Sequence, residues 1–314
     1  MQIDISIAFF ILGVFAALVR AEIQFPRSLY QSLILFLMLA IGLKGGVALA
    51  EHASLELLGQ SLLVLLFGLL LPLVAFPVLY FFGKLPRHDA ASIAAHYGSV
   101  SVGTYAVAVA FLESQNIAYE AYIPLFVVLL EMPAIIVGLA LAKRASGGDA
   151  IDSKKLAHEV FFNQGMVLMV GGLLIGFIGG ERTESIAPFF FTLFNGVLAL
   201  FLLEMGMVAA SRLQEIKRIG SFMLAFGVAM PLTGGLLGCA LGLAMGLTTG
   251  GAILMAVLGA SASYIAVPAA MRVALPGANH SLSIGSSLGI TFPFNVIVGI
   301  PLYTVIVQWM TGAI

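Results

Sequence analysis

The chain has 314 residues, of which 61% are hydrophobic and only 9% are charged, well below the quarter expected of a soluble domain. Its formal net charge is −1 and it has no basic patch, which argues against a nucleic-acid partner. Several apolar runs exceed the roughly 18 residues needed to cross hydrocarbon, so the sequence predicts a polytopic membrane protein. The first apolar run follows no basic region and is expected to be a retained helix, not a signal peptide.

Ten membrane-spanning segments are predicted along the chain, so the expected fold is an all-α polytopic one. Their ranges are 3–19, 28–50, 58–82, 89–112, 120–142, 164–180, 187–210, 219–246, 250–274 and 282–311. Lysine and arginine concentrate on the odd-numbered connections, for example at Arg20, Lys84 and Lys154. Because basic loops stay in the cytoplasm, both termini are expected on the outer, periplasmic side.

Two polar stretches interrupt the fourth and ninth predicted spans. One covers residues 95–104 and the other 258–268, and both are rich in small and hydroxyl-bearing residues. A break there would leave backbone amides and carbonyls without helical partners, which a membrane tolerates only around a protein-lined or watered cavity. Paired breaks would bring half-helix N-termini, which suit an anion, next to C-termini, which suit a hard cation. Close packing of small residues is the alternative interpretation.

Short motifs recur in the same order at a spacing of roughly 160 residues, which favours a duplication. Gly98-Ser-Val-Ser resembles Ala260-Ser-Ala-Ser, and Gly45-Gly-Val-Ala resembles Gly206-Met-Val-Ala. An odd number of spans in each unit would insert the second unit upside down, as in many transporters. The predicted organisation is a first five-helix repeat, a cytoplasmic linker and an inverted second repeat, at 1–144, 145–163 and 164–314.

The predicted site lies where the two polar stretches, read as broken crossing helices four and nine, would meet. Its substrate-binding residues are expected to be Gly98, Ser99, Val100, Ser101, Thr104, Ala260, Ser261, Ala262, Ser263 and Tyr264. Hard cations prefer oxygen ligands. The expected sodium ligands are therefore Ser99, Ser101, Glu131, Ser263, Thr291 and Asn295. Neither stretch contains lysine or arginine, so the bound anion should be small and singly charged.

Other polar and small residues within the spans carry alternative interpretations. Glu131 lies near the middle of the fifth span, and an ionisable residue that deep in the membrane is expected to be functional. The alternative is a structural carboxyl group. Lys44 either extends its charge to the interface or takes part in gating. His96 is either a satisfied core histidine or a proton relay. The glycines at four-residue spacing from Gly234 to Gly250 are expected to form one helix-packing stripe.

The sequence carries none of the motifs that bind a catalytic metal, and no phosphate-binding loop for ATP. Any pumping should therefore draw on an ion gradient. We expect a transporter and not an enzyme, with Na⁺ as the coupling ion and no transition metal or other cofactor.

Three long motifs resemble the SbtA-type sodium-dependent bicarbonate transporters: His96-Tyr-Gly-Ser-Val-Ser, Ala260-Ser-Ala-Ser-Tyr-Ile-Ala-Val-Pro-Ala-Ala-Met-Arg and Leu288-Gly-Ile-Thr-Phe-Pro-Phe-Asn. The resemblance runs through essentially the whole chain. It implies Na⁺/bicarbonate symport across a bacterial inner membrane, a homotrimer, and a PII-like cytosolic regulator for some members. It also implies a core domain of spans three to five and eight to ten, and a gate domain of spans one, two, six and seven.

The expected function is secondary active transport, with sodium-coupled symport of bicarbonate into the cell. The first alternative is sodium-coupled symport of another small monoanion or carboxylate. A cation/proton antiporter, with Glu131 as its obligate carrier, is a second. An intramembrane enzyme is a third, and it is disfavoured because the second polar stretch pairs no nucleophile with a base.

Overall fold

The computed structural model describes residues 5–21, 23–143 and 153–313. The regular secondary structure of these residues is entirely helical, with no β-strand. Eight of the described helices are long and apolar enough to cross a membrane, at Arg27–His52, Leu55–Phe82, Arg87–Ser114, Ile123–Ala142, Gln164–Ser185, Pro188–Ser211, Ser221–Ala244 and His280–Thr311. These eight segments confirm a polytopic membrane protein. The first and ninth predicted spans coincide with shorter apolar helices, Ile5–Leu18 and Thr249–Ala260, so the count of ten spans stays a prediction.

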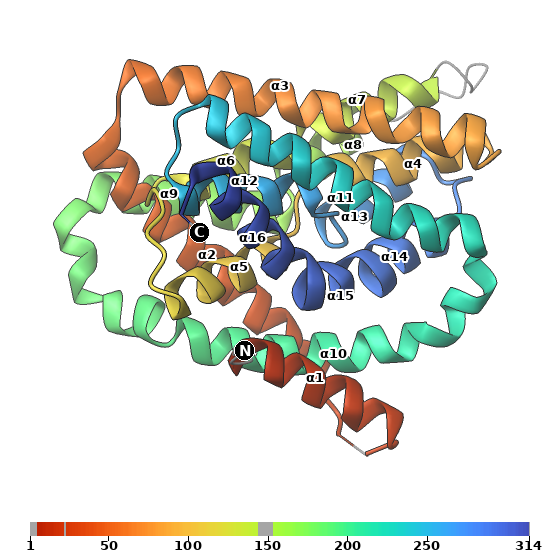
Figure 1. Ribbon diagram of the computed structural model, residues 1–314, viewed down its shortest axis with the longest axis horizontal. Coiled ribbons are helices and arrows are strands. Elements are labelled where there is room, and N and C mark those ends of the chain that lie inside the picture. Colours follow the sequence, from red (N-terminus) through yellow and green to blue (C-terminus); the bar gives the residue numbers. More distant parts are fainter. Residues whose placement is uncertain (1–4, 22, 144–152, 314) are drawn as a thin grey trace.

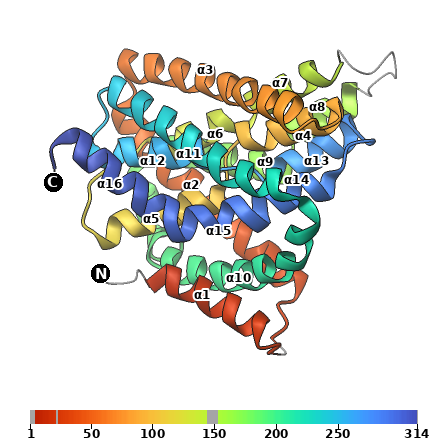
Figure 2. The ribbon, with the colours of Figure 1, turned by 45° about the vertical axis from the view of Figure 1, so that its right-hand side comes forward.

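Four helices form one layer of the molecule, at the positions of predicted spans one, two, six and seven. They are α1 (Ile5–Leu18), α2 (Arg27–His52), α9 (Gln164–Gly179) and α10 (Phe194–Ile219). Helix α1 packs along α10, below the other helices in both views, and α2 packs along α9 (Figure 1, Figure 2). Glycines bring these backbones into contact. A Cβ at Gly46 would overlap the carbonyl oxygen of Leu173, and one at Gly206 would overlap that of Phe10.

The remaining helices pack around the two polar stretches. They are α3 (Leu55–Pro77), α4 (Arg87–Gly98), α5 (Val102–Ser114), α6 (Ile123–Glu131), α7 (Pro133–Lys143), α11 (Ser221–Ala244), α12 (Thr249–Ala260), α13 (Ala266–Ala274), α14 (His280–Ser286), α15 (Phe292–Phe294) and α16 (Ile300–Thr311). Helix α3 covers α4, α6 and α7 and lies at the top of both views (Figure 1, Figure 2). Helix α11 packs along α12.

Both polar stretches interrupt their helices, as the sequence predicts. Helix α4 ends at Gly98 and α5 begins at Val102, while α12 ends at Ala260 and α13 begins at Ala266. The side-chain oxygen of Ser101 accepts a hydrogen bond of 3.1 Å from the amide of Thr104. This is an N-cap, which replaces the helical partner that the new helix lacks in its first turn.

The fifth and tenth predicted spans are also irregular. The fifth consists of α6 and α7, which meet around Met132, directly before Pro133. The tenth passes through two π-helical turns, Ser287–Thr291 and Asn295–Gly299, on either side of α15. Proline lacks an amide hydrogen and crowds the preceding turn, and Pro133, Pro293 and Pro301 lie in or next to these irregular segments.

The predicted glycine stripe is correct only for its first three members. Gly234, Gly238 and Gly242 lie directly against the backbone of α12. Helix α11 ends at Ala244, so the prediction is wrong for the last two glycines. Gly246 adopts a φ of 73° in the turn that follows, a conformation that glycine takes at little cost. Gly250 lies in α12, against the carbonyl of Ala118.

The predicted linker, residues 145–163, is partly helical. Residues 145–152 lie outside the described part of the chain. The remainder contains α8 (Ser153–Phe161), which packs against α13. Asn163 then caps α9 by accepting a 3.0 Å hydrogen bond from the amide of Met166.

Candidate functional site

The two helix breaks lie against each other in the interior of the structure. The amide of Ser263 donates a 2.8 Å hydrogen bond to the carbonyl oxygen of His96. The amide of Ser101 donates a 3.1 Å hydrogen bond to the hydroxyl of Ser261. Each break therefore satisfies part of the other's exposed backbone, which is how an irregular segment is tolerated away from water.

Hydroxyl groups of the first break bind backbone and side-chain groups beside it. Ser99 is fully buried and its hydroxyl donates to the carbonyl oxygen of Glu131 at 3.3 Å. The hydroxyl of Thr104 donates to that of Ser101 at 2.9 Å. Gly98 has no room for a side chain, since a Cβ there would lie 2.5 Å from Cδ of Pro72.

The C-terminal end of α12 is capped from two directions. The hydroxyl of Ser261 donates to the carbonyl oxygen of Leu258 at 2.9 Å, and the side-chain amide of Asn295 donates to that of Ala260 at 2.8 Å. In the same break Ala262 is buried, and the hydroxyl of Ser263 accepts a 3.4 Å hydrogen bond from the amide of Val267. These contacts fix the carbonyl end of α12 beside the start of α5.

A small cavity lies at the junction of the breaks. Five of its lining residues belong to the predicted site: Val100, Ser101, Glu131, Ser263 and Tyr264. Apolar side chains complete the wall, at Met38, Val102 and Ile265. About 10 Å³ is open to the centre of a water-sized sphere, which corresponds to room for roughly one water molecule or one small ion. No lysine or arginine lines the cavity.

Two buried oxygens at this cavity have no hydrogen-bond partner among the described residues. They are Oε2 of Glu131 and the hydroxyl of Tyr264. Glu131 is 3% exposed, so its second oxygen is not compensated by solvent. An unsatisfied polar group in such a place costs free energy. The carboxylate oxygen suits a cation, and the phenol can donate a hydrogen bond to an anion.

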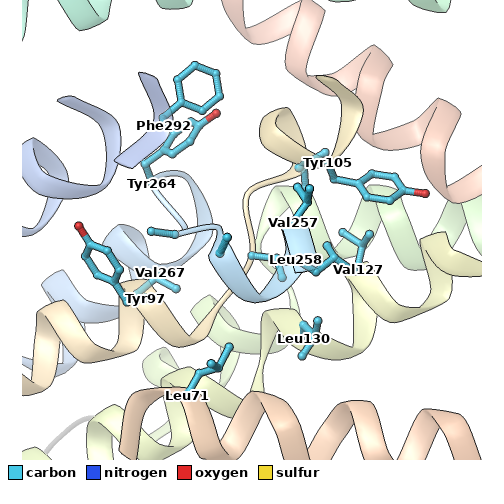
Figure 3. Packing of buried hydrophobic residues seen from close by; sticks show 14 of the residues in the cluster. Leu71, Tyr97, Tyr105, Val127, Leu130, Val257, Leu258, Tyr264, Val267 and Phe292 are labelled. Carbon is cyan, nitrogen blue, oxygen red and sulfur yellow. The ribbon is translucent and has the colours of Figure 1, made fainter. Parts of the chain in front are cut away.

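Tyr264 connects the second break to the first turn of α5. A Cβ at Gly103 would lie 2.6 Å from the Tyr264 hydroxyl, so only glycine leaves room for that oxygen at the helix N-terminus. The Tyr264 ring packs edge-on against Phe292 with a centroid separation of 5.4 Å (Figure 3). The phenol is thus held in place by packing while its oxygen stays without a partner.

Three predicted sodium ligands, Ser99, Thr291 and Asn295, do not line the cavity and have protein partners. The hydroxyl of Thr291 donates to the carbonyl oxygen of Gly227 at 2.7 Å and also contacts the Tyr97 hydroxyl at 2.8 Å. Asn295 caps α12 and accepts a 3.3 Å hydrogen bond from the Tyr303 hydroxyl. The structure therefore groups Ser101, Glu131 and Ser263 at the cavity and leaves the other three outside its lining.

Sequence reasoning missed several residues around the site. Met38 reaches the cavity from α2, but an apolar residue in an apolar helix carries no signal of such a role. Tyr97 holds Thr291, and its place inside the first polar stretch was the available clue. For His96, which sequence reasoning does name, Nδ1 lies 2.8 Å from the carbonyl oxygen of Ser92, while Nε2 is buried with no hydrogen-bond partner among the described residues. The histidine is thus only half satisfied.

Comparison with known proteins identifies the family to which this chain belongs. The described residues hold no group of three or more metal-ligating side chains. No protein of curated function matches the chain. Residues 6–308 match the family described as the Na⁺-dependent bicarbonate transporter superfamily. That family implies sodium and bicarbonate as transported ions. Because the match covers nearly the whole chain, this protein belongs to the Na⁺-dependent bicarbonate transporter superfamily.

Proposed function

We propose that the protein is a secondary active symporter that carries bicarbonate into the cell together with Na⁺. One observation carries this proposal. The cavity between two facing helix breaks holds an unpartnered, buried carboxylate oxygen of Glu131 and no basic side chain. A carboxylate in a membrane protein interior favours a bound cation, and that cation's charge can then hold an anion where no lysine or arginine is present.

Sodium binds first in this mechanism. Glu131 supplies the negative charge, and the hydroxyls of Ser101 and Ser263 lie in the same cavity wall. Ser99 supports this group because its hydroxyl binds the backbone carbonyl of Glu131. Of the remaining predicted sodium ligands, we assign Asn295 and Thr291 the task of fixing α12 and the tenth span around the cation.

The anion binds next to the cation, at the N-terminal ends of α5 and α13. Amides in the first turn of a helix carry partial positive charge, and those that the hydroxyls of Ser101 and Ser263 do not cap can donate to the ligand. The Tyr264 hydroxyl, which has no partner among the described residues, supplies a further hydrogen-bond donor. A single cation and neutral donors neutralise one negative charge, which matches bicarbonate better than a dianion.

The transport step moves a core domain against a gate domain. The packing of α1 on α10 and of α2 on α9 supports two inverted repeats, because it pairs predicted span one with seven and span two with six. Span one corresponds to span six in the other repeat, and span two to span seven. Exchanging the repeats therefore converts each of these helix pairs into the other. In the complete proposal the protein is a homotrimer in a bacterial inner membrane, has both termini on the outer side, and meets a PII-like regulator at its cytoplasmic surface.

Competition between anions tests the identity of the substrate. Purified protein in proteoliposomes with an inward Na⁺ gradient should take up labelled bicarbonate, and about a tenfold excess of unlabelled bicarbonate should remove most of the signal. The same excess of acetate or pyruvate should leave uptake within about twofold, because acetate replaces the bicarbonate hydroxyl with a methyl group that cannot hydrogen-bond, and pyruvate is larger by an acyl group. Strong competition by either carboxylate would replace bicarbonate with an organic anion as the substrate.

A further inference from the structure

A second, larger cavity lies between the α1–α2–α9–α10 layer and the helices that carry the breaks. About 40 Å³ is open there to the centre of a water-sized sphere, enough for a few waters or a small polyatomic ion. One wall comes from α2 and α10, with Ile41 and Phe194, and the opposite wall comes from α5. Its polar side chains are Lys44, Glu113, Tyr119 and Tyr105.

Lys44 brings a positive charge to this cavity, where it pairs with Glu113 while 44% of its side chain stays exposed. Its ammonium group lies 3.0 Å from Oε1 of Glu113 and 3.2 Å from the Tyr119 hydroxyl. The Tyr119 hydroxyl in turn donates to Glu113 at 2.9 Å. An ammonium group has three N–H donors, and these two contacts leave one of them without a protein acceptor among the described residues.

Tyr105 presents a second unused donor to the same cavity. Its side chain is 2% exposed, and its hydroxyl makes no hydrogen bond to any described residue. In Figure 3 the Tyr105 hydroxyl points away from Tyr264, so it does not serve the central cavity. This hydroxyl is therefore free to donate a hydrogen bond to a ligand or a water molecule in the cavity.

We infer that this cavity is a second anion site, in which Lys44 and Tyr105 bind a small monoanion on its way to or from the central cavity. That the anion is bicarbonate rests on the proposed function. Tyr105 lies one helical turn after Ser101 on α5, so the two sites share a helix. Glu113 already offsets the charge of Lys44, so the site has no surplus positive charge to balance a dianion.

Tyr105→Phe is the sharpest test because it removes only an oxygen that no described residue contacts. Bicarbonate binding is measured on purified protein as the rise in melting temperature with sodium bicarbonate, against sodium gluconate at equal Na⁺ concentration. Tyr105→Phe and Lys44→Met should each raise the half-maximal bicarbonate concentration about tenfold, the effect expected when one hydrogen bond to an anion is lost. Both are repeated with Ser101→Ala, which removes the contribution of the central site.

Tyr80→Phe is the matched control, because Tyr80 lies on the π-helical turn after α3 and not in this cavity. It should behave like the wild type. Lys44 and Glu113 could instead serve only as an ion pair that joins α2 to α5. In that case Tyr105→Phe will bind bicarbonate as the wild type does, and the anion site is refuted. If wild-type liposomes show no bicarbonate uptake but the bicarbonate-induced melting shift is present and weakened by Tyr105→Phe, the proposed transport fails while this site stands.

Discussion

Replacing Glu131 with glutamine is expected to lower sodium-dependent bicarbonate uptake roughly 100-fold at a fixed Na⁺ concentration. Glutamine keeps the volume and hydrogen-bonding shape of the side chain but removes the charge that we assign to Na⁺ binding. Loss of one charged ligand costs about 2–3 kcal/mol, and each 1.4 kcal/mol is about a factor of ten. The measurement is initial uptake of labelled bicarbonate into proteoliposomes over a range of Na⁺ concentrations.

The dependence on Na⁺ separates symport from its antiport alternative. Under symport, raising Na⁺ should partly restore uptake by Glu131→Gln, because the remaining oxygens still offer ligands. An obligate proton carrier would give a variant that is inactive at every Na⁺ concentration. Glu51→Gln, at an exposed position near the end of α2, is the charge-matched control and should transport normally. A Glu131→Gln protein with wild-type uptake and wild-type Na⁺ affinity would remove Glu131 from the site.

Gly234→Ala is expected to destabilise the folded protein by about 3 kcal/mol, the upper end of the typical cost when extra atoms are forced into a packed interior. A Cβ at this position would overlap the carbonyl oxygen of Gly259 in α12. Backbone cannot move aside like a flexible side chain, so α11 would have to separate from α12, directly behind the second break. A lower melting temperature in detergent and a lower yield of folded protein should follow.

Gly171→Ala provides the control for a general effect of replacing helical glycines. Gly171 lies in α9, and a Cβ there would have no atom within 4 Å. Alanine should therefore be neutral or slightly stabilising at this position, by up to about 1 kcal/mol from helix propensity. Equal melting temperatures for Gly234→Ala and Gly171→Ala would contradict the close contact between α11 and α12.

The helix breaks could be predicted from sequence because their signal is local. Glycine and serine in the middle of an apolar run, as at Gly98–Ser101 and Ala260–Ser263, mark places where the backbone leaves the helix. The second copy of the pattern suggested that the two breaks face each other, and the hydrogen bonds from Ser263 to His96 and from Ser101 to Ser261 place them in contact.

Contacts between distant segments could not be predicted in the same way. Thr291 and Asn295 matched an oxygen-ligand pattern, but their hydrogen-bond partners Gly227 and Ala260 are fixed by how separate helices pack. The glycine stripe failed beyond Gly242 because the four-residue spacing continues through a turn. The sequence alone does not decide between the two roles of Lys44, because nothing in it shows that Glu113 lies 3.0 Å away.

Sodium dependence of bicarbonate uptake tests the central claim most directly. Proteoliposomes containing the wild-type protein receive labelled bicarbonate under an inward Na⁺ gradient or an equal K⁺ gradient, with the membrane potential held at zero. The account predicts accumulation above equilibrium with Na⁺ and at least about a tenfold lower rate with K⁺, because the anion site is complete only when a cation occupies the Glu131 cavity. Equally fast uptake under both gradients would contradict it.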